Sequence, residues 1–167
     1  MTGENKLKST KQKKRLPAPP EEIEYVVEIT KWFWKYSLSL NPRRYRDDDP
    51  YCESRQLQIT GKLLRPTGLK TEAVQISMWP SSGMNEEMRK DYTPIALGAL
   101  DLRPDMIKGS IGIPADVLSP IMPLLIAKEL KFIVLTASKF RYRSAGITDL
   151  RLETRLTDDA PVNGAPR

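Results

Sequence analysis

The segment from Ile23 to Leu40, IEYVVEITKWFWKYSLSL, constrains the fold more than any other part of the chain. Four aromatic residues fall within positions 32–36, and apolar residues alternate with polar ones, which is the period of a β-strand. Large aromatic side chains supply most of their stabilising energy by burial. We therefore expect the hydrophobic core to be built against a strand in this segment.

The alternation changes phase near Thr30 and Lys31. Apolar residues occupy odd positions from Ile23 to Ile29 and even positions from Trp32 to Leu40. A one-residue slip turns every later side chain to the opposite face, and a β-bulge is the usual way to accommodate it. The pattern predicts a long bent strand that serves two parts of one core.

Trp32 and Trp34 have two interpretations. As residues on the inward phase of the strand, they belong to the core, and this is the interpretation that we favour. The alternative is an exposed platform on which bases or sugars stack.

Other alternating segments predict the remaining strands. They cover residues 55–64, 73–79, 94–102, 107–113, 131–142 and 147–156. Turn residues separate them, including Arg65-Pro66-Thr67-Gly68 and Arg143-Ser144-Ala145-Gly146. The segment 131–142 is apolar on both faces at its start, which is typical of a central strand. The charged outer face of 147–156 would also protect that strand at an edge.

The segment 114–130 differs from the strands, because its apolar residues fall at helical spacing. Asp116 or Ser119 is a suitable N-cap, and Pro120 suits a first helical position. Pro123 limits any helix to short pieces. We predict a short helical segment near 116–130 that closes one end of the strand layers.

These elements predict an all-β, mainly antiparallel fold. Seven or eight strands with turns at even spacing favour a β-sandwich, and a flattened β-barrel is the alternative. A chain of 167 residues accommodates one domain of ordinary size. We expect a disordered basic tail at 1–20, a single domain at 21–157 and a flexible end at 158–167.

The positive charge is concentrated in the tail. Residues 1–20 contain six basic residues and one acidic residue, whereas the rest of the chain contains 21 basic and 20 acidic residues. Attraction to polyanions must therefore come from the tail or from local clusters on the body.

Histidine is absent and Cys52 is the single cysteine. The first fact excludes Ser-His and Cys-His catalysis and ordinary zinc hydrolysis, and the second excludes an intrachain disulfide. We expect no enzymatic activity, no cofactor and no metal. Asp47, Asp49 and Glu53 are the carboxylates to test first for hydrolase or sugar-binding chemistry, and residues 47–49 are the alternative for a metal site.

Basic and aromatic residues supply a second set of candidates. The sequence repeats one tripeptide, as Arg44-Tyr45-Arg46 and Arg141-Tyr142-Arg143, and arginines that flank an aromatic ring suit phosphates and a stacked base. In the late strand, however, alternation predicts that Tyr142 points inward. The nucleic-acid candidates are Lys11, Lys13, Lys14, Arg15, Arg44, Tyr45, Arg46, Arg141 and Arg143.

Two functions follow from these observations. The first is a non-enzymatic binding or assembly module that acts through contacts with a protein partner or with itself. The alternative is a nucleic-acid-associated protein that uses the basic tail and the Arg-Tyr-Arg segments. The sequence shows neither a signal peptide nor a segment of membrane-spanning length, so we expect a cytoplasmic protein without membrane contact.

Overall fold

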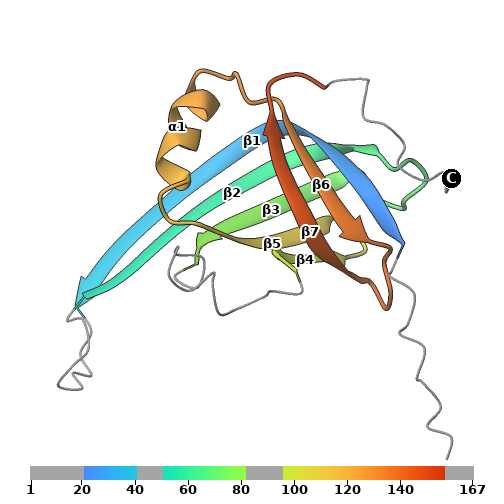
Figure 1. Cartoon of the computed structure of the whole chain (residues 1–167), viewed down its shortest axis with the longest axis horizontal. Coiled ribbons are helices and arrows are strands. Elements are labelled where there is room, and N and C mark those ends of the chain that lie inside the picture. Colours follow the sequence, from blue (N-terminus) through green and yellow to red (C-terminus); the bar gives the residue numbers. More distant parts are fainter. Residues whose placement is uncertain (1–20, 41–50, 82–95, 157–167) are drawn as a thin grey trace, which may run out of the picture.

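The structure is a computed structural model that describes residues 21–40, 51–81 and 96–156. Within these residues the chain forms a closed barrel of seven strands and one helix (Figure 1). The predicted disordered tail at 1–20 and the predicted flexible end at 158–167 lie outside the described residues.

The strands close in the order β1-β2-β3-β5-β4-β7-β6. Their bounds are β1 Glu22–Leu40, β2 Tyr51–Arg65, β3 Ala73–Pro80, β4 Gly98–Leu102, β5 Ile107–Ile113, β6 Phe132–Ser138 and β7 Ser144–Glu153. Neighbouring strands are antiparallel except β3 and β5, which are parallel. The predicted all-β, mainly antiparallel class and its barrel alternative are confirmed, and the sandwich interpretation is compatible with this fold.

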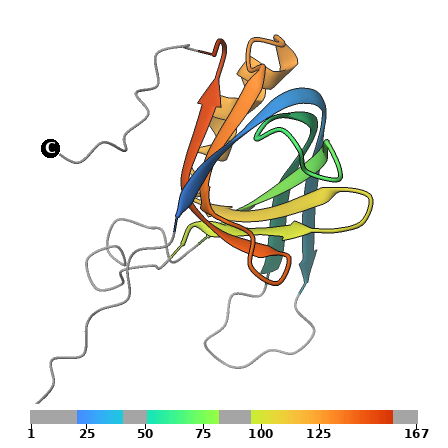
Figure 2. The ribbon, with the colours of Figure 1, turned by 90° about the vertical axis from the view of Figure 1, so that its right-hand side faces the viewer.

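The seven strands curve around a common axis (Figure 2). Apolar side chains fill the interior. No buried residue among those described is polar or charged. The largest fully buried side chains are Tyr25, Leu57, Ile59, Ile76, Met78, Leu100, Ile107, Ile111, Leu118, Ile133, Leu135 and Ile147. A packed core of this kind stabilises the barrel mainly by removing apolar surface from water.

The predicted bulge in β1 is present. The register of β1 against β2 shifts between Ile29 and Lys31, and the inward phase passes there from odd to even positions. Trp32 and Trp34 are half-buried and pack against the core. Each tryptophan therefore belongs partly to the core and also lines a surface pocket.

Beyond Trp34, the prediction that even positions of β1 face a core is wrong. The pairing of β1 with β6 ends at Glu28, and that of β2 with β3 begins at Leu57. Among the described strands, residues 31–40 of β1 thus pair with β2 alone and residues 51–56 of β2 pair with β1 alone, and these two segments project from the barrel (Figure 1). We call this two-stranded ribbon the arm.

The helix α1 (Leu118–Ile126) lies over the barrel end beside the arm (Figure 1) and contributes Leu118, Ile121 and Leu125 to the core. It lies within the predicted segment, but the predicted caps are wrong. The N-cap is Val117 without a side-chain hydrogen bond, and Pro120 is the third helical residue. Burial of the apolar face accounts for the helix without a polar cap.

The prediction that residues 131–142 form one strand with Tyr142 pointing inward is also wrong. β6 ends at Ser138, and the backbone groups of Arg141 and Ser144 exchange two hydrogen bonds of 2.8 and 2.9 Å. Tyr142 and Arg143 form the turn between them, with φ of 50° and 70°, as a two-residue hairpin turn of type I′ requires. The turn therefore comes before the predicted position, and Ser144 already belongs to β7.

Candidate functional site

The arm exposes an apolar face that continues the core face of the barrel. Alternation places Tyr36, Leu38 and Leu40 of β1 on the same side as Trp32 and Trp34, and Tyr51 pairs with Leu40 across the ribbon. The exposed fractions of these four side chains lie between 52% and 69%. Contiguous exposed apolar side chains of this kind can accommodate a partner, unlike apolar side chains that are scattered singly over a surface.

The polar groups on this face neutralise each other. Arg55 pairs with Tyr36 and Glu53 pairs with Leu38, so both lie among the apolar residues. The guanidinium of Arg55 donates to Glu53 Oε1 from Nη2 at 2.7 Å and from Nε at 2.8 Å. Glu53, a candidate for carboxylate chemistry, is therefore held in an ion pair, and the face carries no net charge from this pair.

The outward face of the arm is mainly polar. Lys35 pairs with Gln56, Ser37 with Ser54, and Ser39 with Cys52. Phe33 is the exception, with more than half of its surface exposed. The two faces of the arm thus differ in chemistry.

The predicted nucleic-acid residues Arg141 and Arg143 lie at the tip of the β6–β7 hairpin. Both are exposed, and Tyr142 between them is fully exposed (104%). The backbone N–H of Lys139 donates to the carbonyl of Glu21 at 3.0 Å, which fixes the beginning of the described chain beside this hairpin. The point from which residues 1–20 extend is therefore close to the Arg-Tyr-Arg tip.

The other nucleic-acid candidates lie outside the described residues. They are Lys11, Lys13, Lys14, Arg15, Arg44, Tyr45 and Arg46. Asp47 and Asp49, proposed for metal or carboxylate chemistry, lie outside them as well.

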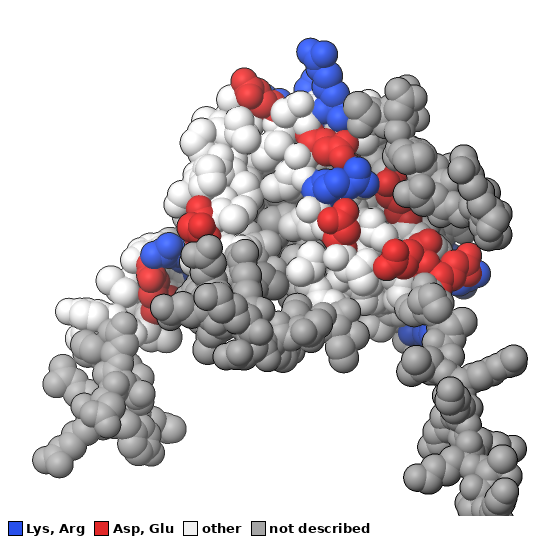
Figure 3. Space-filling view, viewed as in Figure 1, with Lys and Arg blue, Asp and Glu red and all other residues white. Residues whose placement is uncertain are grey.

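Charges of both signs are interspersed on the face that carries β6 and β7, whereas the described surface over α1 is largely uncharged (Figure 3). Arg151 of β7 is the centre of one cluster, since its guanidinium lies 2.8 Å from Glu24, 3.2 Å from Glu153 and 3.3 Å from Asp149. The outward pair of Val26 and Val134 lies beside this cluster, because Val134 pairs with Arg151, and both valines are buried outside the barrel interior. The described face therefore lacks a broad basic patch of the kind that polyanions need.

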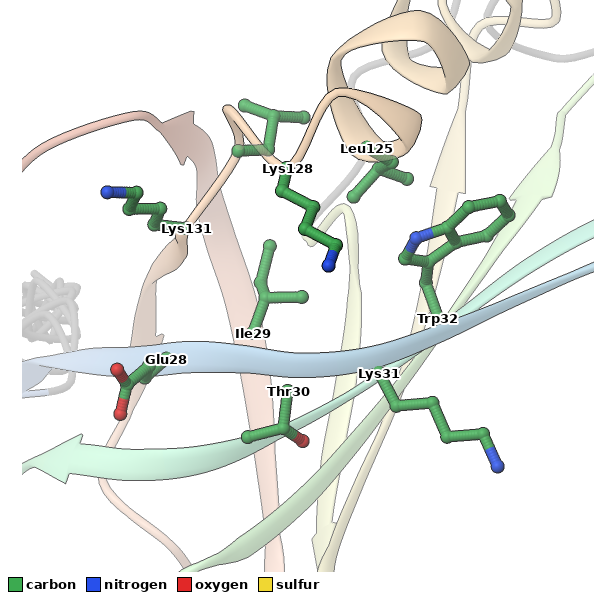
Figure 4. A pocket seen from close by; sticks show the side chains of 9 residues that line it. Glu28, Ile29, Thr30, Lys31, Trp32, Leu125, Lys128 and Lys131 are labelled. Carbon is green, nitrogen blue, oxygen red and sulfur yellow. The ribbon is translucent and has the colours of Figure 1, made fainter.

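A pocket of about 630 Å³ lies between the end of α1 and the bend of β1 (Figure 4). Ile29, Trp32, Leu125 and Leu130 supply its apolar walls, and Lys128 extends into it. The side chains of Lys31 and Lys131 lead away from it, as does that of Glu28 (Figure 4). The pocket thus combines an apolar lining with one inward-pointing cation.

The described residues contain no group of three or more cysteine, aspartate or glutamate side chains placed to hold a metal ion. Their one resolved change in acidity is at Tyr25, where burial raises the pKa of the phenol above its ordinary value of 10.0. No helix in the described part of the chain is long and apolar enough to span a membrane.

The sequence interpretation missed both the arm face and the pocket. A signal for the arm was available, since β1 has 19 residues and strands usually have about 5 or 6. A signal for the pocket was weaker. The segment 114–130 contains no glycine, so another residue had to adopt the left-handed conformation with which helices often end.

No known protein family matches the chain, and neither a curated protein nor a solved structure matches it.

Proposed function

We propose that this chain is a non-enzymatic assembly module that associates with a second copy of itself through the arm. The observation that carries the proposal is the exposed apolar face of Tyr36, Leu38, Leu40 and Tyr51. An isolated two-stranded ribbon is marginally stable in water, because it has no second layer on which to bury its apolar side. Contact with another molecule would supply that layer.

Charge favours a like copy as the partner. Two identical surfaces meet across a twofold axis, so a strongly charged face would repel itself. The Glu53–Arg55 pair leaves the apolar face of the arm without such a charge. Fully burying an aliphatic or aromatic side chain contributes about 1.5–3 kcal/mol, and four half-exposed side chains on each copy provide a useful part of an interface.

The proposal includes a cytoplasmic location. The support for it is the single cysteine, which gives no sign of an oxidising compartment.

Light scattering coupled to size exclusion tests the proposal on the full chain. We expect a mass above the 19.0 kDa of the monomer at micromolar concentration. Leu38→Lys should shift the protein to monomer, because two buried ammonium groups would meet at the interface. Ser37→Lys adds the same charge to the opposite face of the same strand and should leave the mass unchanged.

A monomeric wild type at every concentration, or an equal effect of the two lysine variants, would overturn the proposal. Circular dichroism of each variant should match the wild type, because both positions are exposed and lie outside the barrel.

The alternative function is nucleic-acid association. The specific observation in its favour is that the tail extends from beside the Arg141-Tyr142-Arg143 tip, so both could contact one strand. Phosphate contacts by the tail should give binding that falls steeply with salt, and stacking on Tyr142 should add about 1–3 kcal/mol per base.

Fluorescence anisotropy with single- and double-stranded oligonucleotides across a salt series measures this alternative. We expect glutamine at Lys11, Lys13, Lys14 and Arg15 to reduce the salt dependence, and Tyr142→Ala to weaken single-strand binding further. Lys70→Gln, a change at an exposed residue of the body, is the matched control. The absence of binding by the wild type at low salt would rule the alternative out.

A further inference from the structure

We propose that the pocket between α1 and the bend of β1 binds a small amphipathic carboxylate, with its anionic group on Lys128 and its aliphatic body against the apolar walls. The volume of about 630 Å³ lies within the range of about 300–1,000 Å³ that is typical of small-molecule sites. This site is separate from the exposed end of the arm, so it does not depend on self-association.

Two hydrogen-bond donors converge on the pocket. The ammonium of Lys128 extends into the space between Ile29 and Trp32, and the indole nitrogen of Trp32 faces the same space (Figure 4). Neither side chain has a hydrogen-bond or ion-pair partner among the described residues. A carboxylate accepts from both groups, whereas a cation or an uncharged apolar molecule would leave them unpaired.

The acidic residue nearest in sequence to this bend does not neutralise the site. Glu28 lines the pocket, but its carboxylate lies on the opposite side of β1 from Ile29 (Figure 4). Alternation places Glu28 opposite Ile29, and the bulge after Ile29 brings Trp32 to the same side of β1 as Ile29. The local charge in the pocket is therefore positive.

The apolar walls define the rest of the ligand. Ile29, Trp32, Leu125 and Leu130 come from β1, from α1 and from the segment that follows α1. Three of these four side chains are aliphatic, so they suit an alkyl chain. The polar head and apolar body of a medium-chain carboxylate match the lysine and these walls, respectively.

The backbone at Lys128 supports a role for its side chain. Lys128 has φ of 57°, and its N–H donates to Leu125 O at 3.1 Å while the N–H of Glu129 donates to Leu124 O at 2.9 Å. These bonds form the helix-ending motif whose left-handed position glycine usually occupies. A lysine there is strained, and the left-handed backbone sets the direction in which its Cα–Cβ bond leaves the helix.

Isothermal titration calorimetry of the full chain with decanoate, and with decan-1-ol as the uncharged counterpart, tests the proposal. We expect saturable binding of decanoate. Lys128→Met keeps an unbranched side chain without the charge and should weaken decanoate binding about tenfold or more while leaving decanol binding unchanged. Trp32→Phe removes the indole donor and should weaken decanoate binding several-fold.

Lys131→Met is the matched control, since Lys131 lines the same pocket but points away from it (Figure 4). It should bind decanoate as the wild type does. The proposal is overturned if the wild type shows no saturable binding, if Lys131→Met weakens binding as much as Lys128→Met, or if Lys128→Met weakens decanol and decanoate equally.

Discussion

Lys128 occupies a backbone conformation that costs a residue with a side chain about 1–2 kcal/mol. Glycine avoids this cost but loses about 0.5–1 kcal/mol through its greater freedom in the unfolded chain. We therefore predict that Lys128→Gly raises the free energy of unfolding by about 0.5–1 kcal/mol, measured by urea denaturation.

The neighbouring residue provides the control for that substitution. Ala127 is the C-cap of the same helix, with a right-handed φ of −70°. Ala127→Gly should lower stability by about 0.5–1 kcal/mol, because glycine gains nothing there. If Lys128→Gly and Ala127→Gly changed the free energy of unfolding equally, the backbone of Lys128 would not be strained.

Tyr25 gives the barrel a dependence on alkaline pH. Its side chain is buried, its ring packs edge to face on Phe140 at 5.7 Å, and burial raises the pKa of its phenol. The folded state thus favours the neutral phenol. The stability that comes from burying the neutral phenol is fully present below the pKa of Tyr25 in the unfolded chain, near 10.0. It is lost as the pH rises through the higher pKa of the folded state.

Tyr25→Phe should remove this dependence while keeping the aromatic packing. We expect the wild type to lose stability relative to the variant as the pH rises above about 10, measured by urea denaturation at a series of pH values. A constant difference between the two proteins over that range would show that the phenol of Tyr25 titrates normally.

At the level of elements, β4 depends on a glycine at its pairing with β5. A Cβ atom at Gly98 would meet the carbonyl oxygen of Ser110 and lie 2.9 Å from the Cα of Ile111. Both atoms belong to the backbone of β5, so neither can move without disturbing the pair. Gly98→Ala should lower the free energy of unfolding by about 2–3 kcal/mol.

The adjacent β4–β7 pair contains a matched glycine. Gly146 is the partner of Ala99, and a Cβ atom there would meet Ala96 Cβ at 3.6 Å, an ordinary contact. Gly146→Ala should change stability by less than about 1 kcal/mol. Urea denaturation of both variants checks the comparison, and a large loss from Gly146→Ala would mean that β4 and β7 pack more tightly than described.

The alternation of apolar and polar residues predicted the strands better than it predicted what each strand packs against. The phase change in β1 identified the bulge because a bulge alters the periodicity of side chains within one strand. In β7 the inward phase also changes, from Ala145 and Ile147 to Leu150 and Leu152, with a register shift against β6. Residues 148–156 alternate regularly, so the sequence pattern did not reveal this shift and placed the turn between β6 and β7 too far along the chain.

At the scale of the whole molecule, the closure of the barrel and the exposure of the arm depend on contacts between segments that are distant in the sequence. Alternation shows that Tyr36 and Leu38 share a face with Trp34, but not that β6 and β3 end before reaching them. The same limit applies to Lys128, whose direction depends on where α1 meets the bend of β1. The class of fold was thus predictable from sequence, whereas the arm face and the pocket required the tertiary arrangement.

The arm and the barrel should differ in hydrogen exchange. Residues 26–28 of β1 pair with both β2 and β6, whereas residues 31–40 pair with β2 alone among the described strands. In dilute protein, amides of 31–40 should therefore exchange faster than those of 26–28.

Self-association through the arm adds a dependence on concentration. As the protein is concentrated, protection should rise in residues 31–40 and 51–56 and stay constant in the barrel, because only the arm becomes covered. Leu38→Lys should abolish the rise, and Ser37→Lys should preserve it. A rise at the β6–β7 hairpin instead would place the contact between copies at the Arg-Tyr-Arg tip and would contradict an interface built from the apolar face of the arm.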